Sequence, residues 1–138
     1  MPWKTYRKGA RFEICLWLDE DDSSHVEDFI LELISNNDPD AASMDRLLLR
    51  TADHGPPIGD TTKFKHLKGT GKGLVEFKAR GGARIIGFED KENRRYICSH
   101  GVPKLKAKRF ERYVSRAQDV KELYLLESTP EEGTNYVH

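Results

Sequence analysis

The sequence predicts an α+β fold with the element order β-α-α-β-β-β-α, in which an antiparallel sheet carries a helical hairpin on one face. Three observations lead to this prediction: an alternating strand-like run, two helical stripes with start signals, and three strand-like runs joined by short polar turns. The 138 residues, 37% of them hydrophobic, suffice for one domain with one core. We expect a loose basic arm at residues 1–10, the domain at residues 11–127 and a frayed acidic tail at residues 128–138.

The first strand is predicted at residues 11–18. Phe12, Ile14 and Leu16 point to one side of this run, and Glu13 and Cys15 to the other. The acidic residues 19–22 then form a turn.

The first helix begins after Ser24, which forms a capping box with Glu27 three residues later. Its apolar stripe has helical spacing, and we expect these residues to be buried: Val26, Phe29, Ile30, Leu33 and Ile34.

The second helix follows after a short break, which makes the two helices a hairpin. Asp38 is the expected N-cap, Pro39 the first helical residue and His54 the approximate end. Met44, Leu47 and Leu48 form its expected buried side.

The second half of the chain begins with a turn-rich connection over residues 55–73. Strand-like runs at residues 74–80, 83–89 and 95–100 follow, and the short joints between them predict an antiparallel meander. After Pro103 the helical period returns and continues to about Leu126, with or without a break near Ala117.

Composition and motifs exclude several classes of protein. No apolar run is long enough to span a membrane, and no apolar stretch follows the N-terminal charges as it would in a secretory signal. Cys15 and Cys98 lack metal-ligand spacing, so we expect free thiols in a cytoplasmic protein. The five histidines lack such spacing too, and no nucleotide-binding or hydrolase motif is present. We therefore expect no metal ion and no cofactor.

The zero net charge conceals a strong polarity along the chain. Residues 63–124 contain 17 Lys/Arg against 7 Asp/Glu, whereas residues 1–62 contain 6 against 13. The basic segment indicates a polyanion or an acidic protein as partner. The alternative is an ordinary solvated lysine and arginine surface.

The turn at Gly81-Gly82 decides where Arg84 points. A two-residue loop directs Arg84 into the core, whereas a three-residue loop pairs Ala79 with Ala83 and places Arg84 opposite Lys78. Burying an unpaired arginine is costly, so we predict the second register, with Lys78 and Arg84 on an open face of the sheet. The cationic site predicted around this face consists of Lys78, Arg84, His100, Lys104 and Lys106.

An ordered series of short motifs resembles the RelE/ParE toxin superfamily and, within it, the HigB-like, phage-derived branch. The series consists of residues 65–69, residues 73–78, residues 83–88, and His100-Gly101 before a lysine-rich helix start. The resemblance implies a RelE-like α+β fold and a cognate antitoxin as partner. It also implies metal-independent endoribonuclease activity on ribosome-bound mRNA, in which the ribose 2′-hydroxyl attacks the adjacent phosphate.

The resemblance also suggests roles for individual residues. Arg84 would bind the scissile phosphate. Lys78, Lys104 and Lys106 match basic positions of the family. His100 is the general acid or base candidate because its unperturbed pKa lies near neutrality. Glu76 would act as a base or pair with a neighbouring cation. The expected RNA-binding residues are Lys65, Lys68, Lys72, Arg80, Lys108, Arg109 and Arg112.

A non-catalytic protein on the same scaffold is the alternative function. It would inhibit gyrase, as ParE-like members do, or bind RNA or a protein partner without cleaving RNA.

Overall fold

Six strands form one mixed sheet in the computed structural model of the chain, which describes residues 2–104 and 109–128. The strand order across the sheet is β1-β2-β6-β5-β4-β3. All neighbouring strands are antiparallel except β2 and β6, which run parallel in the middle of the sheet. The strands are β1 (Trp3–Lys8), β2 (Glu13–Trp17), β3 (Phe64–His66), β4 (Val75–Lys78), β5 (Arg84–Asp90) and β6 (Arg95–Val102).

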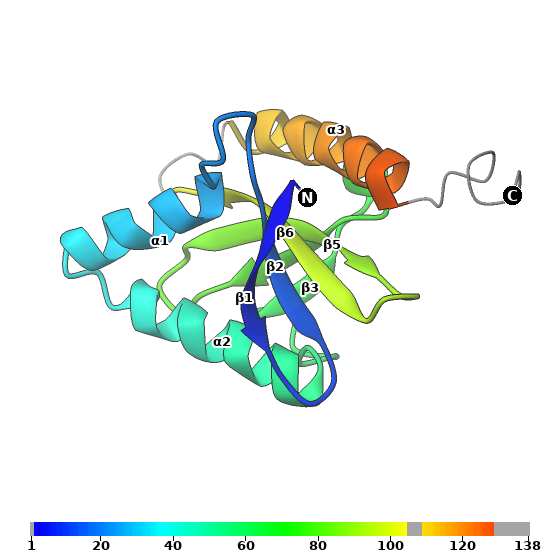
Figure 1. The fold of residues 1–138 in the computed structure, drawn as a ribbon. Coiled ribbons are helices and arrows are strands. Elements are labelled where there is room, and N and C mark those ends of the chain that lie inside the picture. Colours follow the sequence, from blue (N-terminus) through cyan, green and yellow to red (C-terminus); the bar gives the residue numbers. More distant parts are fainter. Residues whose placement is uncertain (1, 105–108, 129–138) are drawn as a thin grey trace, which may run out of the picture.

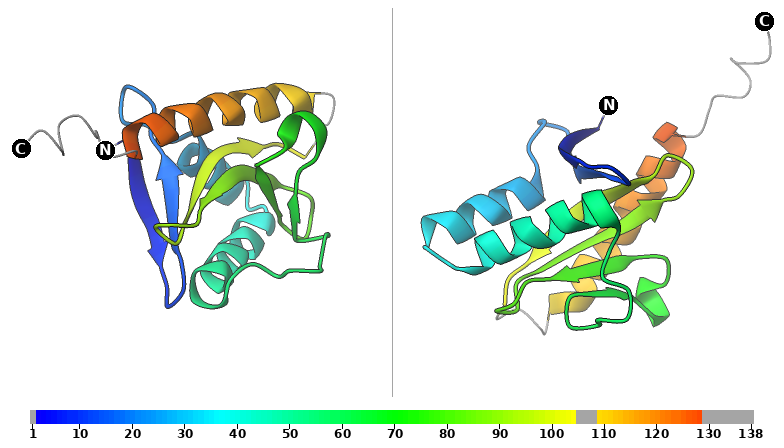
Figure 2. Two further views of the ribbon diagram at one scale, coloured as in Figure 1. Left: turned by 90° about the vertical axis from the view of Figure 1, so that its right-hand side faces the viewer. Right: turned by 90° about the horizontal axis from the view of Figure 1, so that it is seen from below.

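Helices cover both faces of this sheet (Figure 1). The hairpin of α1 (His25–Ser35) and α2 (Asp40–His54) packs on one face, and α3 (Phe110–Ser128) crosses the other. The two further views in Figure 2 show the same three layers. The mixed α/β architecture and the helical hairpin on one face therefore agree with the sequence prediction. The all-antiparallel sheet and the open second face do not.

Two hydrophobic clusters fill the spaces between the layers. The alternation of β2 separates its side chains, so that Ile14 and Leu16 join the cluster under α1 and α2. Cys15 and Trp17 join the cluster under α3, where Val114 and Tyr124 of the helix are buried. A strand with apolar side chains on both faces belongs to the interior of a three-layer structure.

The expected loose arm at the N-terminus is wrong. Residues Trp3–Lys8 form β1, which pairs antiparallel with β2. Trp3 explains why the segment is ordered, because its ring lies 4.8 Å from that of Tyr124 on α3. The positive charges of this segment suggested a solvated arm, but they lie on an edge strand, where Lys and Arg side chains reach water.

The turn-rich connection over residues 55–73 holds more regular structure than the sequence predicts. It contains the short strand β3 and a 3-10 turn at Gly69–Gly71. The 3-10 turn is bound to α3, since the side-chain amide of Gln118 donates hydrogen bonds of 2.9 and 3.0 Å to the carbonyls of Thr70 and Lys72.

The helices begin close to the predicted residues. Ser24 caps α1 by accepting a hydrogen bond of 3.1 Å from the amide of Glu27. Asp38 accepts one of 2.9 Å from the amide of Asp40, so α2 begins one residue later than expected. Ile34 is not in the buried stripe, because its side chain is 55% exposed.

The third helix is continuous, and both cysteines are free. The helix α3 continues through Ala117 without a break and ends at Ser128, and the rest of the expected tail lies outside the described residues. Cys15 and Cys98 are buried free thiols, as predicted. Along the described part of the chain, no helix combines the length and the apolarity needed to cross a membrane.

Candidate functional site

The register of the β4–β5 hairpin places Lys78 directly opposite Arg84, as predicted. The amide of Ala79 donates a hydrogen bond of 2.7 Å to the carbonyl of Ala83, which closes the three-residue loop. Gly82 adopts a φ of 107°, a conformation that glycine reaches without steric cost. The guanidinium of Arg84 therefore stays out of the core between the sheet and the helical hairpin.

A buried carboxylate lies between two of the predicted cations. Glu76 is only 2% exposed, and its Oε2 atom lies 3.4 Å from Nζ of Lys65. Its Oε1 atom lies 3.4 Å from Nε of Arg84 but accepts no hydrogen bond from the described residues. Lys78 lies opposite Arg84, so the four side chains carry three positive charges and one negative charge, a net charge of plus two. We call Lys65, Glu76, Lys78 and Arg84 the hairpin cluster.

Arg84 is held in place from two sides. Its Nε atom faces Glu76, and its guanidinium carbon lies 5.5 Å from the centre of the Phe110 ring at the start of α3. The side chain remains 32% exposed, and neither terminal guanidinium nitrogen donates a hydrogen bond to a described residue. Both terminal nitrogens are therefore without a hydrogen-bond acceptor in the described part of the chain, and a guanidinium in this state is able to bind two phosphate oxygens.

His100 belongs to a different group of side chains. The centre of its ring lies 4.8 Å from that of His25, at a tilted angle, and 6.4 Å from that of Tyr113. Its Nδ1 atom is 2.6 Å from the hydroxyl of Ser99. The pKa of His100 is lowered to about 4, mainly by burial and in addition by the positive charges of His25 and Arg116. A ring with this pKa is neutral at pH 7 and has no proton to donate as an imidazolium.

Lys104 turns away from the hairpin cluster and binds acidic residues next to α2. Its ammonium lies 2.9 Å from Oδ2 of Asp38 and 3.1 Å from Oδ2 of Asp40. These contacts raise the pKa of Lys104, with the hydrogen bond to Asp38 as the largest cause. The expected cationic site therefore contains Lys78 and Arg84 but loses Lys104 to two aspartates, which the sequence did not indicate as its partners.

The described residues among the other predicted RNA-binding positions lie in two places. Lys68, Lys72, Arg109 and Arg112 are exposed around the 3-10 turn and the first turns of α3. Arg80 lies beyond the end of β4, where its amide donates a hydrogen bond of 2.9 Å to the hydroxyl of Ser43 on α2. Lys108 of the RNA-binding set and Lys106 of the cationic site lie outside the described residues.

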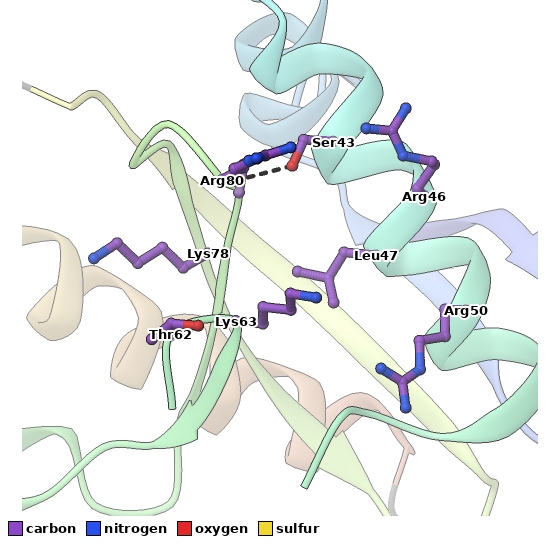
Figure 3. Close-up of a pocket in the computed structure, with 9 residues that line it drawn as sticks. Ser43, Arg46, Leu47, Arg50, Thr62, Lys63, Lys78 and Arg80 are labelled. Atoms are coloured by element: carbon purple, nitrogen blue, oxygen red, sulfur yellow. Dashed lines mark hydrogen bonds between the residues drawn. The ribbon is translucent and has the colours of Figure 1, made fainter. Parts of the chain in front are cut away.

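A pocket between α2 and the end of β4 contains cations that the sequence analysis missed (Figure 3). Its volume is about 580 Å³, and we call it the α2–β4 pocket. In Figure 3 the side chain of Lys63 extends toward α2, whereas that of Lys78 extends away from it. The pocket is lined by Ser43, Arg46, Leu47, Arg50, Thr62, Lys63, Lys78, Ala79 and Arg80.

Arg46 and Arg50 come from the acidic half of the sequence, so segment charge did not point to them. The available signal was their spacing of four residues on the polar face of the second helix, opposite its buried side. That spacing shows that both side chains share one face, but not which part of the sheet lies next to it.

Within residues 2–104 and 109–128, no group of three or more His, Cys, Asp or Glu side chains is placed to hold a metal ion. Comparison with family models, with curated proteins and with solved structures finds no match. The features that bear on function are therefore the two groups of charged side chains, the hairpin cluster and the α2–β4 pocket.

Proposed function

We propose that the protein is a RelE/ParE-type toxin that binds the RNA backbone at the hairpin cluster and cuts ribosome-bound mRNA in the cytoplasm without a metal ion. Its partners on this proposal are the ribosome and a cognate antitoxin. The observation that supports it is the partly exposed side chain of Arg84 opposite Lys78, in a cluster with two excess positive charges. Guanidinium binds two phosphate oxygens at once, and a phosphate held there would also contact the neighbouring ammonium.

Glu76 fits this proposal as a positioning residue. Its buried carboxylate lies 3.4 Å from Nε of Arg84, and the Phe110 ring lies 5.5 Å from the guanidinium carbon, so the two contacts together restrict the orientation of the guanidinium. A pre-oriented arginine loses less conformational entropy when a phosphate binds and stabilises the extra charge of the pentavalent transition state more effectively.

Binding without cleavage is the second candidate function, and the environment of His100 favours it. With a pKa of about 4 this ring carries no imidazolium proton at pH 7 and is a weak base, and it lies against His25 rather than beside Arg84. The carboxylate of Glu76 is paired with two cations, which makes it a poor base for a ribose hydroxyl beside Arg84. Cleavage by this protein would then rest on charge stabilisation and on groups that the substrate or the ribosome supplies.

The test uses induced expression of the full chain together with purified protein. The toxin proposal predicts growth arrest, mRNA cuts associated with codons and products that end in a cyclic phosphate. Arg84→Ala should remove all three effects. Arg84→Lys should retain only part of them, because lysine lacks the paired N–H donors with which a guanidinium binds two phosphate oxygens. Lys91→Ala, which removes an exposed positive charge elsewhere, is the control. RNA binding that depends on Arg84 but leaves the RNA intact identifies the non-catalytic function. Unaltered growth together with no RNA binding contradicts both.

A further inference from the structure

The α2–β4 pocket is lined by four cationic residues besides Lys78 of the hairpin cluster. Arg46 and Arg50 come from α2, Lys63 from the segment before β3, and Arg80 from the end of β4. One acidic residue lies beside these cations, since Oδ2 of Asp60 is 4.0 Å from Nζ of Lys63. The charge of Arg50 also contributes to the lowered pKa of Asp60, after the larger effect of its hydrogen bond with Thr62. These four cations and Asp60 together carry a net positive charge of three, to which Lys78 adds a further positive charge.

This arrangement of like charges is unfavourable for the fold by itself. Arg46 and Arg50 are four residues apart on one helix face, a spacing at which like charges repel. Neither they nor Arg80 form an ion pair with any side chain in the described part of the chain. The hydrogen bond of 2.9 Å from the amide of Arg80 to Ser43 nevertheless fixes the end of β4 against α2 and keeps the cations together. An anion in the pocket would relieve this repulsion.

The lining of the pocket indicates what kind of anion fits. Its polar groups are guanidinium, ammonium and hydroxyl groups, all of which bind phosphate oxygens. Its apolar groups are the aliphatic side chains of Leu47 and Ala79. No aromatic ring lines it, so a nucleobase finds no surface on which to stack. The pocket can recognise phosphate groups but has no means to distinguish one base from another.

We propose that the α2–β4 pocket is a second anion-binding site, which takes phosphate groups of a nucleic-acid backbone irrespective of base sequence. It lies on the face of the sheet covered by α2, whereas Arg84 lies on the face covered by α3. The two sites therefore lie on opposite faces of the sheet, and the pocket does not depend on the function proposed for the hairpin cluster. Lys78 belongs to the hairpin cluster and also lines the pocket, although its side chain extends away from α2 (Figure 3).

Fluorescence anisotropy with a labelled, mixed-sequence single-stranded RNA tests this site. The pocket variant is Arg46→Gln/Arg50→Gln, and Lys8→Gln/Lys91→Gln is the control because it removes two exposed positive charges elsewhere. We expect the pocket variant to bind RNA at least tenfold more weakly at about 50 mM salt, with the control within twofold of the unaltered protein. The slope of log K against log salt falls by about 1.4, which corresponds to two lost phosphate contacts on a single strand.

Three further measurements decide how the result is read. Lys63→Gln/Arg80→Gln alters the same pocket from other elements and must weaken binding similarly, and thermal melting verifies that each variant is folded. Inorganic tripolyphosphate is added as a competitor of RNA. If it displaces RNA from the unaltered protein but does not bind the pocket variant, the pocket also accepts free polyphosphate. If it does not displace RNA, the phosphate groups that the pocket binds are those of the RNA backbone. Equal RNA affinities of the pocket variants and the control overturn the proposal. Arg84→Gln, measured in the same assay, shows how much the hairpin cluster contributes to RNA binding, so that failure of one site is distinguished from failure of the other.

Discussion

The carboxylate of Asp40, at the start of α2, accepts a hydrogen bond of 2.7 Å from the amide of Gly81 in the β4–β5 turn. Its second oxygen accepts one of 2.9 Å from the amide of Ala83 and also binds the ammonium of Lys104. The carboxylate is only 2% exposed, so a residue far away in the sequence fixes the loop that precedes Arg84. The orientation of the hairpin cluster therefore depends on α2.

Replacing Asp40 with alanine leaves two amide groups of the turn without their acceptor. Each buried N–H group that loses its partner costs about 1–3 kcal/mol, so we expect a free energy of unfolding lower by about 2–4 kcal/mol. Urea unfolding measures this loss. The control Asp119→Ala, on the exposed side of α3, should change stability by less than about 0.5 kcal/mol. Equal losses in both variants would show that the turn does not depend on Asp40.

Replacing Glu76 with glutamine removes the negative charge from the hairpin cluster while keeping the shape of the side chain. The cluster then carries three positive charges instead of a net two, and RNA affinity at low salt should rise about fivefold, or about 1 kcal/mol. Anisotropy with labelled RNA measures the change. Glu92→Gln makes the same charge change in the exposed β5–β6 turn and should alter the affinity much less. Weaker binding by Glu76→Gln would mean that orientation of Arg84 outweighs charge.

Acidification should destabilise the protein through His100. The pKa of His100 is about 4 in the folded protein and 6.5 as the ordinary value, so the unfolded chain takes up a proton in this window that the folded chain does not. Stability is therefore full above about pH 6.5 and falls by about 2–3 kcal/mol as the pH drops toward 4. His25, whose pKa burial also lowers, adds to the loss in the same direction.

Urea unfolding at about pH 7, 6 and 5 measures this effect. His100→Asn should show a clearly smaller decrease over the same range, because the asparagine does not titrate. An NMR titration of the His100 ring provides the direct measurement. A ring that titrates at its ordinary pKa contradicts the expected coupling.

Replacing Trp3 with alanine tests whether the N-terminal strand contributes to stability. Trp3 packs on Tyr124 at 4.8 Å and lies 5.7 Å from the guanidinium carbon of Arg95. We expect a loss of about 1–3 kcal/mol, because the ring is only partly buried and a fully buried tryptophan costs more. Lys4→Ala, at the next position and with an exposed side chain, should cost less than about 1 kcal/mol. A loose arm would show no loss in either variant.

Patterns between neighbouring residues of the sequence predicted much of the fold and, of the candidate site, the positions of Lys78 and Arg84. The Ser24 cap, the buried residues of α2 and the opposition of Lys78 and Arg84 all follow from spacing and from the cost of burying an unpaired arginine. These features depend on neighbours in the sequence or on a single hairpin.

The features that the sequence did not reveal depend on distant partners. Lys104 forms ion pairs with Asp38 and Asp40, which precede it by more than 60 residues. The segment of β1 is ordered because Trp3 meets Tyr124 on α3. Arg46 and Arg50 join basic residues of the second half only because α2 lies beside the end of β4. Periodicity and charge along the chain contain no information on these contacts.

The parallel pairing of β2 with β6 has a consequence for synthesis of the chain. Residues 13–16 of β2 pair with residues 95–98 of β6, so the strand from the N-terminal hairpin finds its inner neighbour only after most of the chain has been made. Until then β2 presents free backbone amides and carbonyls beside a row of apolar side chains, a surface that favours aggregation during translation. Nascent chains that stop before β6 should therefore depend on chaperones more strongly than chains released at full length.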